Sequence, residues 1–420
     1  MGKKSNFNSK IGVILAAAGS AVGLGNIWKF PYMVGENGGS AFLLIYLVCC
    51  LLIGLPIMIA EFSIGKRAGV GLEGAFRTLT GNKHWQWLSA LGFIVSLLLL
   101  SFYPVVTGWC ILHVFRLPDN TITQIIFGGL SLLITCIISW YGVQNGLERM
   151  SKILMPIFII LLLLLIGKSL MLSGSNLGIQ FLFDTDFSKI NSNVILNAMG
   201  QSFFSLSVGV GVILTFGSYM PKSQNIIATS VQVVTLDTLI SILSGLAIFP
   251  AVFALGFNPA EGPQLVFDIL PKVFGLMSFG EVWTTLFFTL LSLAAITSLL
   301  SMLEVAVTYV SDKTQVSRKK SISLLFILLF ASMCLCVLFP YLFDFYDNLV
   351  SQYLMPIGGL AITIFVGWFT TKNDTIDELK KHSRIQVNWP YTVFFVLIRY
   401  IIPLAILLIF LNGLGIFERL

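Results

Sequence analysis

Charged residues are scarce in this chain of 420 residues. Asp, Glu, Lys and Arg make up 10% of it, whereas hydrophobic residues make up 56%. This composition excludes an ordinary soluble globular protein and is typical of a chain that crosses a membrane many times. The net charge of +6 does not indicate nucleic-acid binding, because the basic residues lie in loops between apolar runs.

Histidine and cysteine are also few, and their positions exclude several kinds of chemistry. Three His are too few for a His-based metal site, and the six Cys all lie inside apolar runs, where free thiols are expected rather than disulfides. No pattern of a Ser, His or Cys nucleophile stands out, so we expect neither an enzyme nor an organic cofactor. The segment 1–10 is polar and basic, and no cleavable signal peptide is predicted.

Long apolar segments, by contrast, fill most of the sequence and predict an all-α membrane protein with about 11 transmembrane helices. The predicted segments are 11–35, 40–65, 88–116, 121–142, 152–172, 194–218, 225–256, 280–311, 321–341, 345–371 and 390–415. If the amino terminus is inside, most of the 25 Lys and Arg fall in inside loops, as the positive-inside rule requires. We therefore expect a multi-pass protein of the cell (plasma) membrane with a cytoplasmic amino terminus and an extracellular carboxyl terminus.

The first apolar segment cannot be an ordinary spanning helix, because three glycines interrupt its middle. Gly19, Gly23 and Gly25 lie within seven residues, and each costs a helix about 1 kcal/mol against alanine. A helix that breaks there exposes backbone groups that lipid cannot satisfy. A Gly-rich packing helix is the alternative, but Asn26 and Lys29 follow at once. We interpret the segment as a discontinuous helix that lines a polar site.

A second interrupted segment lies five spans further along the chain. Its middle, GQSFFSLSVGVG at 200–211, combines glycines with Gln and Ser. Two interrupted helices at corresponding positions of two five-span halves are typical of inverted-repeat transporters. We expect a single transporter domain over 1–420, with repeats at 10–172 and 194–371 and an additional helix 11 at 390–415.

Two further features support a site between the helices. The loop 257–279 has an apolar portion around Phe267 that predicts a short helical cap over the outer mouth, with a solvated connector as the alternative. Glu61 and Asp237 are carboxylates in the middle of apolar segments, where a charge costs at least ~2.5 kcal/mol and marks a functional residue by default. We expect Glu61 to support the broken first helix.

Four motifs carry a resemblance to a known family. They are GSAVGLGNIWKFPY at 19–32, ENGGSAF at 36–42, GQSFFSLSVG at 200–209 and AAITS at 294–298. The sequence resembles the neurotransmitter:sodium symporter family, and its bacterial amino-acid transporter branch most closely, over essentially the whole chain. The resemblance implies a leucine-transporter-like 5+5 inverted-repeat fold with discontinuous helices 1 and 6. The usual fold has twelve spans, whereas this sequence shows eleven.

The function that the resemblance implies is sodium-coupled secondary active symport of an amino acid by alternating access. The expected partners are the amino acid, sodium and the lipid bilayer. A transport-dead amino-acid sensor and an ion channel stay open as alternatives.

Two sodium sites are implied, and sodium, as a hard cation, prefers oxygen ligands. The family pattern forms the first site from the Ala21 carbonyl, Asn26, Ser205, Asp237 and the substrate carboxylate. It forms the second site from the carbonyls of Gly19, Val22 and Ala294 with the side chains of Thr297 and Ser298.

Asp237 also bears on chloride. Chloride-dependent relatives resemble this chain but carry Asn there, so the carboxylate is expected to replace the chloride charge and make chloride unnecessary. The alternative is a neutral Asp with a retained chloride, because four residues still match those around that ion: Tyr46, Gln201, Ser205 and Ser241.

The implied substrate site combines backbone groups of the broken helices with an apolar pocket. Its residues are Ala21, Gly23, Gly25, Leu99, Tyr103, Phe204, Ser207, Val210, Ser298 and Met302. Gly23 stands where monoamine carriers of the family have Asp, which indicates a substrate with its own carboxylate. Val210 stands where the leucine-transporter pattern has Phe, which favours large apolar or aromatic L-amino acids.

Gates are implied on both sides of this pocket. Lys29 and Asp347 match the outer ion pair of the family. Lys4 and Asp312 match the inner pair, with Tyr219 beside it.

Overall fold

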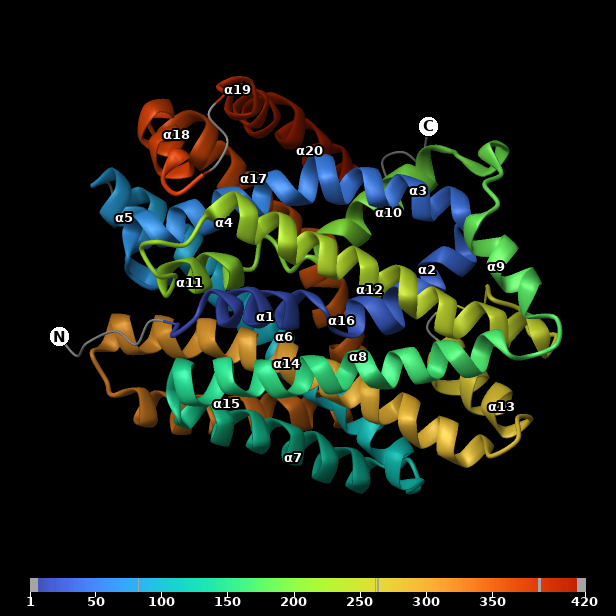
Figure 1. Cartoon of the computed structure of the whole chain (residues 1–420). Coiled ribbons are helices and arrows are strands. Elements are labelled where there is room, and N and C mark those ends of the chain that lie inside the picture. Colours follow the sequence, from blue (N-terminus) through green and yellow to red (C-terminus); the bar gives the residue numbers. More distant parts are fainter. Residues whose placement is uncertain (1–6, 82, 261, 263, 384–386, 414–420) are drawn as a thin grey trace.

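The computed structural model describes residues 7–81, 83–260, 262, 264–383 and 387–413, and all regular elements within these ranges are helical (Figure 1). The first half contains α1 Lys10–Ala21, η1 Gly25–Lys29, α2 Phe30–Glu36, α3 Ser40–Cys49, η2 Cys50–Gly54, α4 Leu55–Ala68, α5 Leu72–Thr80, η3 Lys83–Trp85, α6 Gln86–Phe115, α7 Thr121–Trp140, η4 Val143–Glu148, α8 Arg149–Leu170, α9 Ser175–Phe183 and η5 Phe187–Lys189.

The second half begins with another broken helix. It contains α10 Ser192–Ser205, α11 Val212–Ser218, α12 Ile226–Ala254, η6 Leu265–Ile269, α13 Leu270–Gly275, α14 Gly280–Thr314, α15 Arg318–Leu338, α16 Pro340–Asn348, η7 Leu349–Leu354, α17 Met355–Ile364, η8 Phe365–Phe369, α18 Lys372–Lys380, α19 Trp389–Val396, η9 Leu397–Ile401 and α20 Ile402–Gly413.

The spans agree with the apolar segments of the sequence. Among the described residues, nine helices are long and apolar enough to cross a membrane, and α1 with Gly25–Glu36 forms a tenth span bent by 48° at its break. The sixth predicted segment, 194–218, corresponds to α10 and α11, which the stretch 206–211 separates into two short helices. The two discontinuous helices are therefore the two that glycine interrupts.

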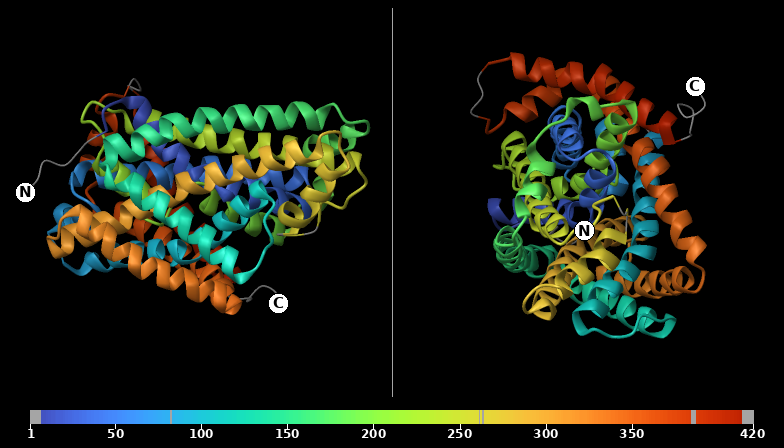
Figure 2. Two further views of the ribbon diagram at one scale, coloured as in Figure 1. Left: turned by 90° about the horizontal axis from the view of Figure 1, so that it is seen from below. Right: turned by 90° about the vertical axis from the view of Figure 1, so that its right-hand side faces the viewer.

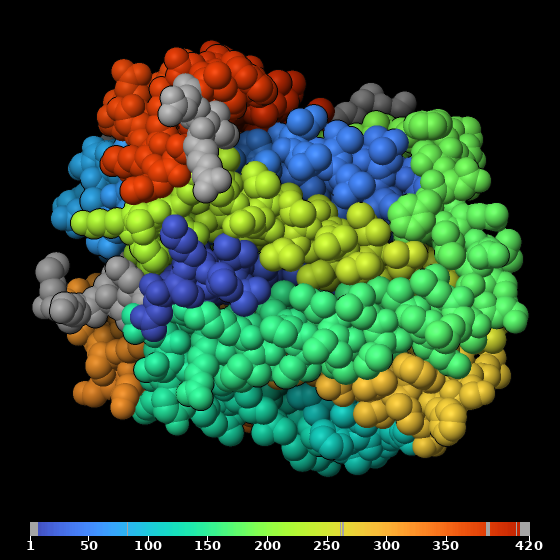
Figure 3. Space-filling model, in the orientation of Figure 1, coloured from blue at the N-terminus to red at the C-terminus, as the bar shows by residue number. Residues whose placement is uncertain are grey.

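The broken helices lie inside the molecule. α1 packs against α8, α12 and α14, and α11 packs against α4. The second half of α1 is enclosed by the other helices, since every residue from Ala16 to Ala21 is buried. In the space-filling view α1 reaches the surface only near the end where the chain begins (Figure 3). Each break is thus surrounded by protein, which is the condition under which irregular backbone is tolerated in a membrane.

The loop after α12 is a helical cap. Leu265 and Leu270 are fully buried, and the Phe267 ring lies 6.0 Å from that of Trp28 and 5.9 Å from that of Trp109. This packing over η1 and α6 confirms the predicted helix and excludes a solvated connector.

Candidate functional site

The break in the first helix leaves backbone groups for the site. α1 ends where Val22 adopts an extended conformation with ψ of 92°, and the Asn26 Oδ1 then accepts a hydrogen bond of 3.1 Å from the Gly23 amide. A Cβ on Gly23 would collide with the hydroxyl of Ser298 on α14. Gly25 lies against the Phe204 ring, and a Cβ there would approach that ring to 3.1 Å. Both positions therefore need glycine because another element comes so close.

The break between α10 and α11 depends on left-handed backbone. Ser207, Gly209 and Gly211 have φ values of 51°, 85° and 86°. The Gly209 amide donates a hydrogen bond of 2.6 Å to the Glu61 Oε1. The expectation that Glu61 supports the first broken helix is therefore wrong, because its carboxylate binds the second. The position of Glu61 in the sequence does not show which of the two broken helices α4 contacts at the level of this residue.

A fully buried polar cluster lies where the first sodium site was predicted. The Asn26 Nδ2 lies 2.7 Å from the Asp237 Oδ1 and 3.1 Å from the Ser205 Oγ. The Ser205 hydroxyl lies 2.8 Å from the Asp237 Oδ2. These three side chains come from η1, α10 and α12, and each has a relative exposure of 0%. The structure thus joins three segments far apart in the sequence into one oxygen-rich cluster.

The four residues that match a chloride site lie at the same place. The Tyr46 hydroxyl on α3 lies 3.0 Å from the Ser205 Oγ, 3.1 Å from the Ser241 Oγ and 3.3 Å from the Asp237 Oδ2. Gln201 donates from its Nε2 to the Gly25 carbonyl at 2.9 Å. The Asp237 carboxylate therefore lies directly beside the groups that surround chloride in the family pattern.

The second predicted sodium site lies between α14 and the end of α1. The hydroxyl of Thr297 donates to the Ala294 carbonyl at 2.8 Å, and that of Ser298 lies 3.3 Å from the carbonyls of Ser20 and Ala294. A Cβ on Gly19 would lie 3.5 Å from the Thr297 Cβ. The structure brings these predicted ligands together, with Val22 as the first residue beyond α1.

A small cavity with a volume of about 30 Å³ lies between the two breaks. All ten residues predicted for the substrate site line it, and so do three residues that were not predicted: Ser20, Val212 and Met355. Tyr103 closes one side, and its hydroxyl accepts a hydrogen bond of 3.2 Å from the Leu24 amide. Ser20 and Val212 lie next to the glycines at the two breaks, and this position in the sequence could have predicted that they line the cavity. Nothing in the α17 sequence singles out Met355.

The predicted outer gate residues are not in direct ionic contact. The Lys29 Nζ lies 4.2 Å from the centre of the Phe204 ring, while Asp347 accepts a hydrogen bond of 2.9 Å from Ser351. An ammonium over an aromatic face is attracted by the ring quadrupole. Lys29 therefore covers the side of the cavity that Phe204 forms, and its pairing with Asp347 stays a prediction.

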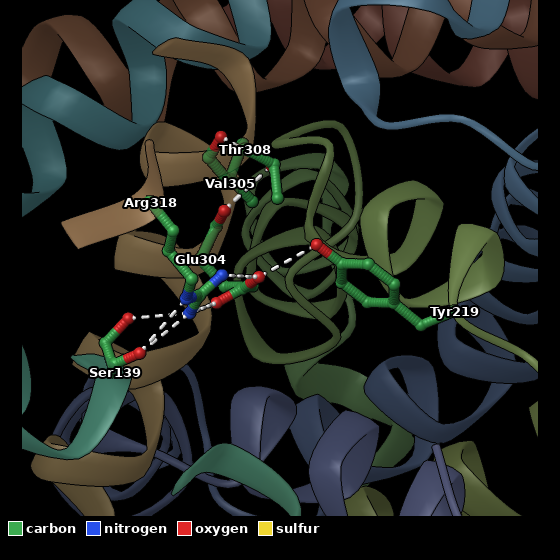
Figure 4. A network of polar contacts seen from close by, with 6 residues as sticks. All are labelled: Ser139, Tyr219, Glu304, Val305, Thr308 and Arg318. Carbon is green, nitrogen blue, oxygen red and sulfur yellow. Dashed lines mark hydrogen bonds and ion pairs between the residues drawn. The ribbon is translucent and has the colours of Figure 1, made fainter. Parts of the chain in front are cut away.

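On the other side of the cavity, Tyr219 belongs to a network of polar contacts (Figure 4). Its hydroxyl donates to the Glu304 Oε1 at 2.8 Å, and Arg318 donates to the same oxygen at 2.8 Å. Arg318 also donates to the Ser139 carbonyl at 3.0 Å, which connects α15 to the end of α7. Lys4 lies outside the described residues, and the pairing of Asp312 stays a prediction.

Glu304 was not predicted, although its position in the sequence is a usable signal. It lies inside the apolar run SMLEVAVTYV of α14 and is 1% exposed. The rule that singled out Asp237 and Glu61, a carboxylate in the middle of an apolar segment, applies to it equally. Its partner Arg318 lies fourteen residues away on the next helix, and sequence alone does not pair them.

Comparisons with known proteins agree with this architecture. The model of the Sodium:neurotransmitter symporter family matches residues 4–123 and 123–419. The "Uncharacterized sodium-dependent transporter YhdH" of Bacillus subtilis is 37% identical and covers 99% of this chain and 98% of its own length. An uncharacterized sodium-dependent transporter of Haemophilus influenzae is 32% identical, with 98% of each chain covered. The crystal structure of MhsT in complex with L-phenylalanine superimposes with a TM-score of 0.89 at 38% identity, covering 98% of this chain and 100% of that one.

Proposed function

Because the chain belongs to the sodium:neurotransmitter symporter family, we propose that this sodium-dependent transporter takes up large apolar or aromatic L-amino acids. The observation that carries the proposal is the cavity between the two broken helices. Free backbone groups suit the charged ends of an amino acid, and the remaining lining is mainly apolar. Two clusters of oxygen ligands flank it, as coupling of substrate to a hard cation requires.

The proposed first sodium ion lies beside the cavity, coordinated by the Ala21 carbonyl and the side chains of Asn26, Ser205 and Asp237. The substrate carboxylate completes this site, so the ion and the amino acid stabilise one another. The proposed second ion lies against the carbonyls of Gly19, Val22 and Ala294. Because it bridges α1 and α14 through Thr297 and Ser298, it links closure of α1 to ion binding.

Two sodium ions supply enough free energy for concentrative uptake. At 100 mV each charge contributes roughly 2.3 kcal/mol, and a tenfold gradient adds about 1.4 kcal/mol per ion. The total of roughly 7 kcal/mol sustains a substrate gradient of about five decades.

The proposed substrate class follows from what the cavity contains. Gly23 brings no side-chain carboxylate to the cavity, and a side chain there would collide with Ser298, so the substrate is expected to carry its own carboxylate. Val210 and the flexible side chains of Met302 and Met355 form an adaptable apolar wall. MhsT has a crystal structure with L-phenylalanine, which supports an aromatic substrate for its relative. If glycine competes better than leucine, tyrosine and tryptophan, this assignment is wrong.

Alternating access requires that each side of the cavity opens in turn. We propose that Lys29 with Phe204 and Tyr103 closes the outer side, aided by Asp347. The Tyr219–Glu304–Arg318 contacts close the inner side, together with the predicted Lys4–Asp312 pair. Transport is proposed to be independent of chloride, because Asp237 supplies a fixed negative charge beside the first ion.

Sodium-dependent binding of labelled L-phenylalanine to the purified protein tests the proposal. Binding is expected in sodium and not in potassium. Asn26→Ala, or Thr297→Ala with Ser298→Ala, is expected to lower the apparent sodium affinity by at least ~10-fold, equivalent to about 1.4 kcal/mol. Ser292→Ala is the matched control, since the hydroxyl of this buried Ser on α14 donates to the Phe288 carbonyl of its own helix. Equal binding in potassium rejects sodium coupling.

A further inference from the structure

An apolar groove on the outer face of the bundle lies between α7 and α15, which run side by side (Figures 1 and 2). Its volume is about 430 Å³. Cys136 and Ile322 form a buried floor, with exposures of 5% and 1%. Ile137 and Ile327 form walls with exposures of 50% and 68%. In a chain that crosses the membrane, such a groove is open to the hydrocarbon of the bilayer.

The groove has a chemically distinct mouth at one end. Trp140 and Tyr141 lie there, at the end of α7, and aromatic residues of this kind mark the level of the lipid headgroups. From Leu133 to Trp140 the groove extends for roughly 10 Å at 1.5 Å per residue. That length suits a stretch of one acyl chain that begins at the headgroup and runs toward the membrane centre.

The mouth of the groove is positively charged. The Lys319 Nζ lies 5.5 Å from the centre of the Trp140 ring, and Lys320 is exposed beside it. Within the described part of the chain, neither lysine forms an ion pair. Neither α7 nor α15 contains an acidic residue. Arg318 is already neutralised by Glu304, so the two lysines are the cations available to a ligand.

We propose that this groove binds one anionic glycerophospholipid, with its headgroup phosphate at Lys319 and Lys320 and one acyl chain between α7 and α15. The occupant follows from the combination of an apolar floor, an aromatic headgroup level and an uncompensated positive mouth. The lysines also lie on the side that the positive-inside rule predicts to be cytoplasmic, where anionic lipids attract basic segments. A zwitterionic lipid fits the groove equally well but offers the lysines no net charge.

The mouth of the groove and the Tyr219–Glu304–Arg318 contacts involve neighbouring residues of the same two helices. Trp140 follows Ser139 in α7, and Lys319 follows Arg318 in α15, while Arg318 donates to Ser139 across the same helix pair (Figure 4). The lipid therefore stabilises the α7–α15 contact on its outer face, and Arg318 stabilises it on the inner face. This inference does not depend on which amino acid the protein transports.

Native mass spectrometry of the purified full chain tests the proposal. The protein is incubated in detergent with equimolar phosphatidylglycerol and phosphatidylcholine of identical acyl chains, and the retained lipids are counted. The parent is expected to retain one phosphatidylglycerol at about tenfold excess over phosphatidylcholine. Lys319→Ala with Lys320→Ala is expected to abolish that excess. Ser323→Trp, which fills the groove from α15, is expected to abolish retention of that lipid altogether.

Two matched controls separate the groove from general effects. Leu324→Trp places the same side chain at a 62% exposed position outside the groove, and it is expected to retain the lipid. Lys83→Ala with Lys222→Ala removes the same charge from exposed positions elsewhere, and the tenfold excess is expected to persist. Equal retention of the two lipids by the parent, or full retention by Ser323→Trp, overturns the proposal.

Discussion

Asp237 is the residue whose charge we propose to decide whether the transporter requires chloride. An unpaired buried charge is costly, and two adjacent cation sites in a protein interior need compensation. The Asp237 carboxylate accepts hydrogen bonds from Tyr46 and Ser205, two of the groups that match a chloride site. We therefore propose that this carboxylate replaces a bound chloride.

Asp237→Asn is expected to make transport depend on chloride. The substitution removes the charge but keeps an oxygen ligand and leaves Tyr46, Gln201, Ser205 and Ser241 in place. The measurement is uptake in chloride against gluconate, for the parent and the variant. Strong chloride dependence of the parent protein contradicts the assignment.

Arg318 is expected to contribute substantially to stability, because it is the cation that pairs with the buried carboxylate of Glu304. Its side chain is 26% exposed and that of Glu304 is 1% exposed. Arg318→Gln leaves Glu304 without that partner, so we expect a loss of about 2–3 kcal/mol, somewhat less than for a fully buried pair. Thermal unfolding of the parent and the variant in detergent measures this loss of stability. Arg149→Gln, which removes the same charge from an exposed position, is expected to melt like the parent, and an unchanged melting temperature for Arg318→Gln refutes the prediction.

At the scale of elements, glycine patterns predicted where helices break but not what supports the breaks. The positions of both interruptions were evident from the sequence, because glycine there has no place in a lipid-facing helix. The partners were not evident, since Glu61 is closer in sequence to the first break and yet binds Gly209 in the second. Contacts between helices depend on how each helix is rotated about its axis and on its position along the membrane normal. Helices that are apolar on all faces carry no sequence pattern that shows either quantity.

The short helix α18 is another element that periodicity did not predict. It docks on the end of α4, where the Lys66 Nζ lies 3.2 Å from the Glu378 carboxylate and donates to the Gln224 carbonyl at 2.7 Å. Lys381 lies 3.0 Å from the same carboxylate. Glu378 thereby connects the segment after the tenth span to the ends of α4 and α12.

This docking is expected to weaken in acid. Burial alone would raise the pKa of Glu378, but the hydrogen bonds from Lys381 and Lys66 outweigh it and hold the pKa below the usual 4.5. A carboxylate with a lowered pKa stabilises the folded state above its unfolded pKa, and that contribution is lost as the pH falls through the folded value.

Hydrogen exchange of α18 measures this effect. Protection is expected to be full above pH 4.5 and to fall below it, and Glu378→Gln is expected to reduce protection already at neutral pH. Asp377→Asn changes the exposed neighbouring acid and serves as the control. Protection of α18 that is the same in Glu378→Gln and the parent at neutral pH speaks against the ion pair as its anchor.

For the whole molecule, the all-helical membrane fold and its two discontinuous helices were predictable because span length and glycine content are local properties of the sequence. The residues that line the cavity were predictable from the family motifs, and all ten predicted ones line it, while their role in substrate binding stays a proposal. Glu304, Arg318 and Met355 were not predicted, because each gains its role from a neighbour on another helix. The membrane orientation stays a prediction from the distribution of Lys and Arg.

Uptake of labelled L-phenylalanine into proteoliposomes tests the central claim, sodium-coupled amino-acid transport, most directly. With an inward sodium gradient, the internal concentration is expected to rise transiently above the external one, and replacing sodium by potassium on both sides is expected to abolish this accumulation. A channel allows the substrate only to equilibrate, and a transport-dead sensor binds it without uptake. Equal uptake in sodium and potassium, or binding without accumulation, contradicts the account.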